Sequence, residues 1–487
     1  MLLGIDVGTS SCKVGLFENS GKLLADASRP YRSFYPHPGW VEQNPEDWWD
    51  AAKTAVRSLV EQSGVSPADI DGIGIDGQSW SAVAIGNDGQ CLGMSPIWLD
   101  TRAKDLCTEV EQHIGQDRIF SVAGNRFRPN YSTPKILWYK RNLPELYNNT
   151  FKFLQSNSYI AYKLTSVFSQ DVCQAYGLHF FDNAKLQYDA SLAEEFGIDL
   201  EKFPQLYSCS AVVGTVTKEA AEACGLRTGI PVVAGGLDAA CAALGAGVYQ
   251  PGQTQEQSGQ AGGMSICTDF PAAHPDLISS PHVVPGRWLL QGGTTGGAGV
   301  MRWLQQELWP DTGFQELSAL AESVQAGSDG VIFLPYMSGE RSPIWNPDAK
   351  GVFYGLGFDK KRAHLVRAAM EGVAFSLRHN LETAEAANTR VGTLTAVGGA
   401  ANSSVWMQIK ADVTGRTVEI CSSDTGTVFG AAILAAMGIC LCKDPSEMLS
   451  KNITVKKKYT PNPESHAFYT QQMGQYLKLL KYSSEMF

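Results

Sequence analysis

A strand–glycine loop–strand unit opens the chain, and the same pattern recurs where the second half begins. Apolar strands are predicted at Leu2 to Ile5 and Lys13 to Phe17, joined by the turn Gly8-Thr9-Ser10-Ser11. A third predicted strand, Lys22 to Ala27, follows Asn19-Ser20-Gly21. Together these segments predict a β-meander at the N-terminus.

The second unit lies just after residue 245. Its predicted strands are Thr254 to Ser258 and Met264 to Thr268, around Gly259-Gln260-Ala261-Gly262-Gly263. Two halves that open alike suggest an ancient duplication. At 487 residues the chain also exceeds what one hydrophobic core supports. We therefore predict two domains, residues 1–245 and 246–487, with a ligand cleft between them.

Helical and strand patterns alternate along the rest of the chain, which predicts mixed α/β layering. Further strands are predicted at 70–75 and 81–85. The predicted helices span residues 47–62, 134–142, 299–308, 362–387, 404–414, 427–437 and, after the break at Pro461 to Pro463, 465–482.

Composition excludes several classes of function. A formal net charge of −10 argues against nucleic acid as a partner, because phosphate contacts need a concentrated basic face. The basic tract Lys456-Lys457-Lys458 is predicted to be a solvated loop. No apolar run is long enough to span a membrane, so we expect no membrane partner. The eleven cysteines include no Cys-x-x-Cys pair, as expected of reduced thiols in a cytoplasmic protein.

Asp238 follows the predicted buried strand Pro231 to Ala234 and the turn Gly235-Gly236, where backbone can approach a ligand without interference from a Cβ. The small residues Ala239 to Ala243 then predict a tightly packed helix. The N-terminus of this helix is expected to hold Asp238 ionised through the helix dipole. The alternative is that the carboxylate simply caps the helix. In the first case Asp238 is a base within reach of a bound ligand.

Asp6 ends the first predicted strand, directly before the turn at Gly8. The amides and hydroxyls of such a turn solvate phosphoryl oxygens, and a carboxylate beside them holds Mg²⁺ directly or through water. The alternative is a plain β-hairpin with a polar turn. The loop Gly259 to Gly263 offers amides but few hydroxyls. A third cluster, Ala396 to Ser404, follows a strand and opens a helix, an arrangement that receives a nucleotide against the helix N-terminus.

The order of these segments resembles that of the FGGY carbohydrate kinases, and the resemblance covers nearly the whole chain. The shared segments are Asp6-Val7-Gly8-Thr9-Ser10, Gly236-Leu237-Asp238-Ala239-Ala240, and Gly398-Gly399-Ala400-Ala401 with Trp406, Ala411-Asp412 and Gly415. The most specific match, to the family's second signature, is Gly351-Val352-Phe353-Tyr354-Gly355-Leu356, then His364-Leu365 and Ala368-Ala369-Met370-Glu371. The resemblance implies an α/β fold of two actin-like, ribonuclease H-like domains of the hexokinase and actin superfamily, flanking a deep inter-domain cleft.

Within this family the chain is most similar to xylulokinases. The similar segments are His37-Pro38-Gly39-Trp40-Val41-Glu42-Gln43-Asn44-Pro45 and Phe333-Leu334-Pro335-Tyr336-Met337-Ser338-Gly339-Glu340-Arg341-Ser342-Pro343. Trp48 and Trp49, which share a predicted helical face, are assigned to core packing.

The resemblance also implies roles for individual residues. Asp238 matches the catalytic base, and Asp6 and Asp238 match the acidic groups that organise Mg²⁺. ATP is the implied cofactor, and the residues expected to bind it are Gly8, Thr9, Ser10, Lys13, Gly259, Gln260, Gly262, Gly297, Gly398, Gly399, Ala400 and Asn402. The implied sugar-binding residues are Gln78, Ser79, Trp80, Asp100, Arg102 and Asp238. A homodimer is the assembly that the family suggests.

Two segments depart from the xylulokinase pattern. The second phosphate loop usually reads Gly-Thr-Ser-Gly, and here Gln260 and Ala261 replace the two hydroxyl residues. The sugar-binding stretch usually reads Gly-Gln-Met-His-Gly, and here Gln78 is followed by Ser79 and Trp80, so that an indole replaces an imidazole. We expect Trp80 either to stack on a sugar face or to shrink the pocket.

We expect an ATP-dependent kinase that phosphorylates a ketopentose or a related polyol, with D-xylulose as the single best candidate. In this mechanism Asp238 accepts the proton of a sugar hydroxyl as its oxygen attacks the γ-phosphorus. The alternative from another class is a sugar-binding or sugar-sensing protein that has lost turnover, which Gln260 and Ala261 motivate. A kinase of the same family for glycerol, gluconate, ribulose or another ketose is a further alternative. An actin-like filament ATPase is less favoured, since that role needs no second carboxylate aimed at a sugar.

Overall fold

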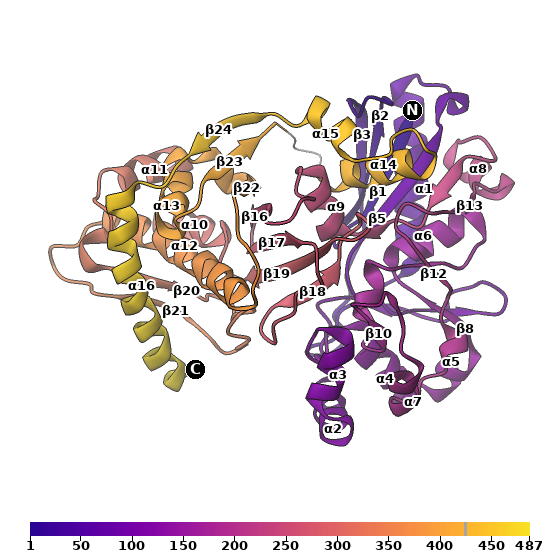
Figure 1. Ribbon diagram of the computed structural model, residues 1–487, viewed down its shortest axis with the longest axis horizontal. Helices are drawn as coiled ribbons and strands as arrows, with labels where there is room; N and C mark the ends of the chain where they lie inside the picture. The colour runs from indigo at the N-terminus through magenta and orange to yellow at the C-terminus, as the bar shows by residue number, and fades with distance from the viewer. Residues whose placement is uncertain (423–425) are drawn as a thin grey trace.

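The computed structural model describes residues 1–422 and 426–487, which form two α/β halves side by side, each built on a seven-stranded sheet (Figure 1). The first sheet has the order β13-β14-β5-β1-β2-β3, and β15 also pairs with β5. Its strands are β1 (Leu2–Val7), β2 (Ser11–Phe17), β3 (Leu23–Pro30), β5 (Gly72–Gly77), β13 (Val212–Thr215), β14 (Pro231–Val233) and β15 (Gly236–Leu237).

The second sheet repeats the topology of the first, with the order β18-β19-β17-β16-β22-β23-β24. In each sheet the first strand pairs antiparallel with the next one and parallel with a later one, as β1 does with β2 and β5, and β16 with β17 and β22. This confirms the predicted repeat and the α/β layering. The strands are β16 (Thr254–Ser258), β17 (Gly262–Thr268), β18 (Ile278–Pro281), β19 (Trp288–Thr294), β22 (Leu394–Val397), β23 (Val418–Cys421) and β24 (Val455–Tyr459).

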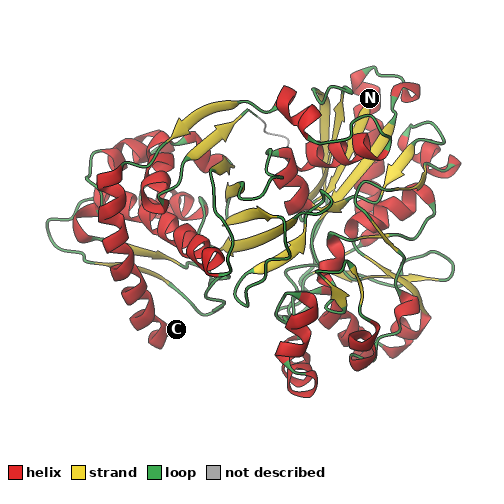
Figure 2. Cartoon of the chain, viewed as in Figure 1, coloured by secondary structure: helices red, strands yellow, loops and turns green. Residues whose placement is uncertain are grey.

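Helices lie outside the two sheets and between them (Figure 2). In the first half they are α1 (Pro45–Ser63), α2 (Lys104–Ile114), α3 (Gln116–Ala123), α4 (Ser132–Asn142), α5 (Pro144–Asn149), α6 (Ser156–Thr165), α7 (Ala190–Glu195), α8 (Lys218–Cys224) and α9 (Asp238–Gly245). In the second half they are α10 (Gly299–Trp303), α11 (Phe314–Glu322), α12 (Arg362–Ala386), α13 (Ser404–Thr414), α14 (Gly426–Gly438), α15 (Ser446–Asn452) and α16 (Pro463–Ser483). Two smaller antiparallel pairs join β6 (Val83–Gly86) to β8 (Thr150–Leu154) and β20 (Ile332–Pro335) to β21 (Gly351–Tyr354).

Both faces of β1 are covered, and its alternating side chains divide between two helical layers. Leu3 and Ile5 share a core cluster with Trp48 and Trp49 of α1, which confirms that these tryptophans pack in the core. Leu2 belongs to the cluster formed by α9 and α14 on the opposite face. Since successive residues of a strand point to opposite faces, Asp6 lies on the α14 side with Leu2.

Helix α14 comes from the second half of the sequence but packs against β1 and β5 of the first sheet. Glycine makes this approach possible: a Cβ on Gly4 would lie 2.1 Å from the carbonyl oxygen of Val428, and a Cβ on Gly74 would lie 1.8 Å from that of Ala431. Neither position has room for a side chain. The helix backbone therefore lies directly on the sheet.

The layer of α9 and α14 also joins the two halves. Its apolar cluster includes Cys267 of β17 and Leu289 of β19, which belong to the second sheet. A hydrogen bond of 3.0 Å from Gln255 Nε2 of β16 to the carbonyl of Ala242 in α9 crosses the same junction. The boundary at residue 245 stays a prediction, and around it the two halves share one packed layer.

Two predicted segments differ from expectation. The helix predicted at 299–308 is α-helical only to Trp303 and then widens into a π-helical turn, because the N–H of Trp309 donates to the carbonyl of Leu304, five residues earlier. The tract Lys456 to Lys458, predicted as a solvated loop, is part of strand β24. Pairing with β23 makes it extended, and lysines are a common choice on such an edge strand.

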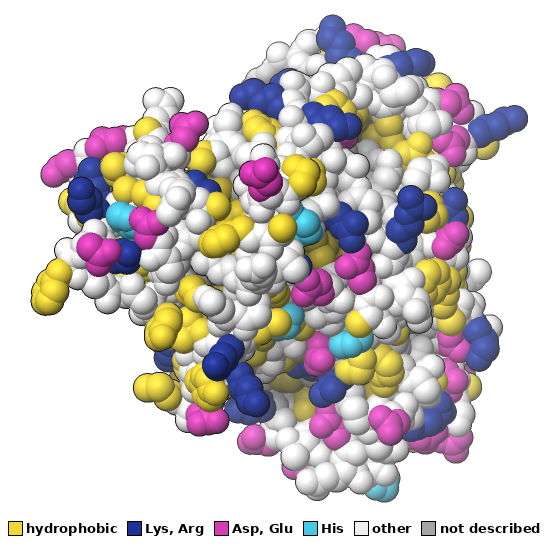
Figure 3. Space-filling model, turned by 60° about the vertical axis from the view of Figure 1, so that its left-hand side comes forward, with side chains coloured by type: hydrophobic (Ala, Val, Ile, Leu, Met, Phe, Trp, Pro, Cys, Tyr) yellow, Lys and Arg dark blue, Asp and Glu magenta, His cyan; other side chains and the backbone are white. Residues whose placement is uncertain are grey.

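No helix among residues 1–422 and 426–487 is long and apolar enough to cross a membrane. On the face drawn in Figure 3, lysine and arginine side chains are interspersed with aspartate and glutamate.

Replacing Gly74 with alanine tests the close approach of α14. We expect Gly74→Ala to lower the free energy of unfolding by about 3 kcal/mol, because the new methyl group collides with helix backbone that cannot move alone. Chemical denaturation measures the change. Gly474→Ala is the matched control: Gly474 lies inside α16, and nothing comes within 4 Å of the place its Cβ would take, so alanine should stabilise by up to about 1 kcal/mol. Equal stability of both variants would contradict the account.

Candidate active site

Asp238 is the first residue of α9 and directly follows β15, as the sequence predicts. Its Oδ1 accepts a hydrogen bond of 2.6 Å from the N–H of Ala239, the next residue. The residue at the capping position is Leu237, so Asp238 does not cap the helix in the usual way. The turn before Asp238 requires glycine at position 235. Gly235 has a φ of 79°, and a Cβ added to it would lie only 1.9 Å from the carbonyl oxygen of Ile75.

The charge state of Asp238 depends on its burial. Burial raises its pKa from 3.8 to about 7, and the negative charge of Asp6 contributes to this rise. The loss of hydration at the site therefore acts against the ionised form that the helix N-terminus was expected to favour. Near neutral pH the group is poised between its acid and base forms.

Asp6 faces a second buried carboxylate, Asp76, which the sequence analysis missed. The two residues are direct partners on the parallel strands β1 and β5, and they are 3% and 0% exposed. Burial raises the pKa of Asp76 well above its usual range, and the charges of Asp6 and Asp238 add to this effect. A signal was present: the tripeptide Gly-Ile-Asp occurs at residues 4–6 and again at 74–76.

Two groups stabilise the carboxylate of Asp6. Thr427 Oγ1, at the start of α14, donates a hydrogen bond of 2.9 Å to Asp6 Oδ2, and Lys13 Nζ lies 3.9 Å from the same oxygen. Burial raises the pKa of Asp6, and the Lys13 charge acts against that shift. The packing of α14 on the sheet is what brings Thr427 to this position.

The carboxylates around Asp6 fit a divalent cation. Within the part of the chain that the structure describes, Asp6 Oδ1 and both carboxylate oxygens of Asp76 are buried without a hydrogen-bond partner. Carboxylate oxygens are the ligands that Mg²⁺ prefers, and a cation offsets the cost of burying several negative charges together.

The first predicted phosphate loop presents Thr9 to the cleft. Thr9 Oγ1 accepts a hydrogen bond of 2.9 Å from Trp98 Nε1, and the Thr9 carbonyl accepts one of 2.6 Å from Gln43 Nε2. The loop is closed by the N–H of Gly8, which donates to the carbonyl of Ser11 over 3.1 Å, and Ser10 is exposed. The loop is thus held in place while its outer side stays open.

The second predicted loop is exposed at Gly259, Gln260 and Ala261 and buried at Gly262. Gly297 lies against it: a Cβ there would come within 2.6 Å of the Gly262 nitrogen. Beneath the loop, the buried ion pair between Lys410 Nζ and Glu256 Oε1, 2.6 Å long, ties α13 to β16.

The third predicted segment follows β22, and α13 spans Ser404–Thr414, which confirms the predicted helix. A 3-10 turn, Gly399–Asn402, comes first, and α13 then starts with Ser403 as its N-cap. Gly398 has a φ of 93° and approaches the second loop, since a Cβ would lie 2.7 Å from the carbonyl oxygen of Ser258. Ala400 is buried. Gly399 and Asn402 line two adjoining cavities of about 680 and 540 Å³.

A cavity of about 270 Å³ brings many of the predicted residues together. Its lining includes Asp238, Thr9 of the first loop, Gly262 of the second loop, and Ser79 and Trp80 of the predicted sugar site. These residues come from distant parts of the sequence. Their meeting in one cavity is the geometric basis for the site.

Trp80 lines this cavity, and Tyr131 covers one face of its ring. It stacks on Tyr131 with ring centroids 4.1 Å apart, and Tyr176 lies tilted 5.9 Å from it. Of the two predicted alternatives, the geometry favours a Trp80 that narrows the cavity. Gln78 is 1% exposed and lies behind the wall, where its Nε2 donates to Gln43 Oε1 over 2.8 Å.

Asp100 and Arg102 do not line the cavity. Asp100 is fully buried, and its carboxylate accepts hydrogen bonds from Arg102 and from the N–H of Val41, the latter 2.7 Å long. Arg102 also pairs with Glu42 and lies 4.0 Å from the ring centre of Trp40. Arg102 thus holds the Asp100 carboxylate in place. A sugar contact by either residue stays a prediction.

Other residues of the cavity wall were not singled out from the sequence. Tyr176, Gln257, Gln291 and Arg341 all contribute to the lining. Arg341 belongs to the segment that resembles xylulokinases, which was a signal for its importance. The polar groups make the cavity suited to a hydroxylated ligand.

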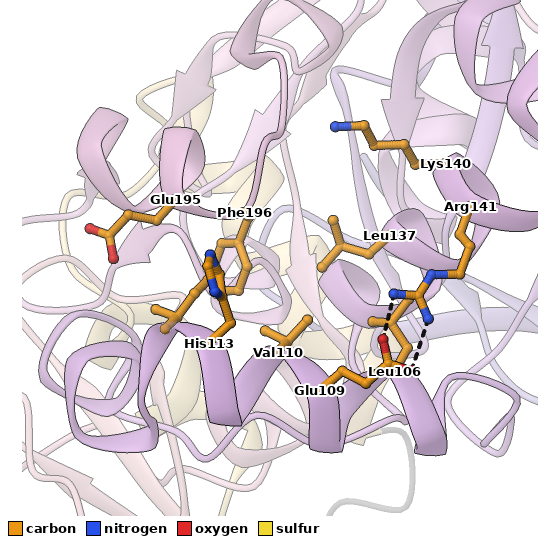
Figure 4. Close-up of a pocket in the computed structure, with 10 residues that line it drawn as sticks. Leu106, Glu109, Val110, His113, Leu137, Lys140, Arg141, Glu195 and Phe196 are labelled. Atoms are coloured by element: carbon orange, nitrogen blue, oxygen red, sulfur yellow. Dashed lines mark hydrogen bonds and ion pairs between the residues drawn. The ribbon is translucent and has the colours of Figure 1, made fainter.

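A separate hollow of about 540 Å³ lies among α2, α4 and α7 (Figure 4). Its floor is apolar, with Val110 and Leu137 facing Phe196, and on its rim Arg141 is paired with Glu109 over 2.7 Å. It contains none of the predicted site residues. We therefore place the candidate active site in the cleft around Asp238.

Models of a known family match most of the chain. The N-terminal domain of the FGGY family of carbohydrate kinases matches residues 1–245, and the C-terminal domain of that family matches residues 266–439. The xylulose kinase of Escherichia coli (strain K12) is 31% identical over 485 residues, which cover 98% of each chain.

Solved structures agree with this match. The xylulose kinase from Rhodospirillum rubrum superposes with a TM-score of 0.93 at 30% identity, covering 100% of this chain and 99% of that one. The gluconate kinase from Lactobacillus acidophilus has a TM-score of 0.93 at 25% identity, covering 99% and 97%. The chain therefore belongs to the FGGY family of carbohydrate kinases and has the two-domain, actin-like α/β fold of that family.

Proposed function

We propose that this carbohydrate kinase transfers the γ-phosphate of ATP to a ketopentose, and that D-xylulose is its substrate. The observation that carries the proposal is the cavity in which Asp238 meets residues of both predicted phosphate loops, Thr9 and Gly262. The similarity to xylulose kinases at about 30% identity supports the choice of sugar. The similarity to gluconate kinase keeps a different sugar as the second candidate.

Asp238 acts as the base in the proposed reaction. Its carboxylate takes the proton of the sugar hydroxyl while the hydroxyl oxygen forms a bond to the γ-phosphorus, and the bond from that phosphorus to the β-phosphate oxygen of ADP breaks. A pKa of about 7 suits this role, since the group is ionised in a large share of molecules at neutral pH and binds the proton readily.

Asp6 and Asp76 are the proposed holders of Mg²⁺, together with Asp238. When bound, Mg²⁺ supplies positive charge that offsets the charge on the phosphates. Thr427 and Lys13 orient the Asp6 carboxylate for this task. The buried oxygens of Asp76 extend the donor set beyond the two carboxylates predicted from the sequence.

A helix N-terminus supports phosphate binding in the cleft. Helix α14 begins at Gly426, and its residues Gly426 and Thr427 line the cavity of about 680 Å³ next to Gly398 and Gly399. The N-terminus of α9, at Asp238, lies on the cavity of about 270 Å³ instead. Backbone N–H groups at a helix start are free to bind anions and carry the positive end of the helix dipole. The cavity of about 680 Å³ is the proposed place of the nucleotide phosphates.

A sugar sensor without turnover is the second candidate, because Gln260 and Ala261 remove two hydroxyls from the second loop. The charge state of Asp238 counts against it. A binding protein gains nothing from burying a carboxylate whose pKa lies near 7, and it loses stability through the cost of burial.

A panel of acceptors tests the proposed function. With ATP and Mg²⁺, we expect ADP to form fastest with D-xylulose. The kcat/KM for gluconate or glycerol should be at least about tenfold lower.

Replacing the proposed base tests its role. Asp238→Asn should lower kcat by about a thousandfold with little change in KM, because it removes the base and keeps the shape of the side chain. Asp269→Asn, at an exposed site after β17, is the control. Sugar binding without ADP release would favour the sensor. Faster turnover of another sugar would make that sugar, and not D-xylulose, the proposed substrate.

The pKa of Asp238 predicts the pH profile of the kinase. Only the ionised carboxylate accepts a proton, and burial raises the pKa to about 7, so activity should be lost as pH falls through that value. We expect kcat/KM at pH 6 to be about tenfold below that at pH 8. Steady-state rates at saturating ATP measure the profile. A constant kcat/KM from pH 8 down to pH 5.5 would mean that Asp238 is not the base.

A further inference from the structure

Strand β24 carries a bulge next to the proposed nucleotide site. Cys421 of β23 pairs with Val455, and Ile420, one residue earlier, pairs with Lys457, so Lys456 is an extra residue without an opposite partner. In a regular strand, neighbouring side chains point to opposite faces. A bulge breaks this alternation and often re-aims side chains beside an active site.

The bulge brings two consecutive lysines to one cavity. Lys456 and Lys457 both line the cavity of about 680 Å³, together with Gly398, Gly399 and Asn402. Ala242 of α9 and Ala246, the residue that follows this helix, line the same cavity. Lys458, the third member of the tract, pairs with Glu419 over 3.2 Å. Lys456 and Lys457 therefore face the cavity, whereas Lys458 pairs with Glu419.

The two lysines supply positive charge to the cavity of about 680 Å³. In the described part of this cavity's lining, they are the charged residues, and the other groups are small, apolar or neutral polar ones. The neighbouring cleft holds the carboxylates Asp6, Asp76 and Asp238, which repel a polyanion.

From this arrangement we infer that Lys456 and Lys457 bind the phosphates of the nucleotide. The ligand class is a nucleoside di- or triphosphate, and the inference rests on the proposed kinase function. The lysines are exposed and act at the non-transferred phosphates, so they strengthen binding and leave the chemical step unchanged.

Isothermal titration of the full-length protein with MgADP and with adenosine tests this inference. We expect the Kd for MgADP to rise about fivefold with each of Lys456→Ala and Lys457→Ala, and more with both, because each removes one solvent-screened charge pair. The Kd for adenosine should not change, since adenosine has no phosphate. Lys458→Ala is the matched control from the same tract and should leave both affinities unchanged. Thermal unfolding of each variant confirms that it is folded.

Steady-state kinetics and the salt dependence of MgADP affinity show whether the lysines act on phosphate binding alone. The double variant should raise the KM for ATP without lowering kcat, and its MgADP affinity should depend less on salt than that of the wild type. Unchanged MgADP affinity in the double variant, or an equal loss of adenosine affinity, would overturn the role of the lysines while leaving the kinase proposal in place. A wild-type protein that binds no MgADP would overturn both.

Discussion

The contact of α14 with the first sheet is the constraint on which the site depends. Gly4 and Gly74 present no side chain to the helix, so its backbone lies directly on β1 and β5. This approach sets Thr427 against Asp6, although the two are 421 positions apart in the sequence. The same helix packs on α9, which begins with Asp238. Strands from one end of the chain and a helix from the other end therefore complete one site.

The cost of that arrangement is electrostatic. Burial raises the pKa of Asp6, Asp76 and Asp238; the charge of Asp6 raises the pKa of the other two further, and the charge of Asp238 adds to the rise at Asp76. Such a cluster destabilises the folded protein unless cations offset it. Lys13 and the N-termini of α9 and α14 offset part of it. A kinase needs this concentration of charge, because a metal and a base must meet the same phosphoryl group.

Much of the fold was predictable because strand and turn patterns are local. The strands around the first two loops, α13 and the position of Asp238 all follow from short segments. What escaped prediction depends on tertiary context. Burial and Asp6 set the pKa of Asp238, and Tyr131 sets the stacking of Trp80. The position of Lys456 depends on a bulge that pairing with β23 creates. Sequence motifs carry no such information about neighbours.

A crystal structure with D-xylulose and a non-hydrolysable ATP analogue tests the central claim most directly. We predict one sugar hydroxyl within about 3 Å of an Asp238 carboxylate oxygen, and on its other side the terminal phosphate of the analogue. A complex in which the sugar binds away from Asp238, or in which that carboxylate faces neither the hydroxyl nor the phosphate, would contradict the account.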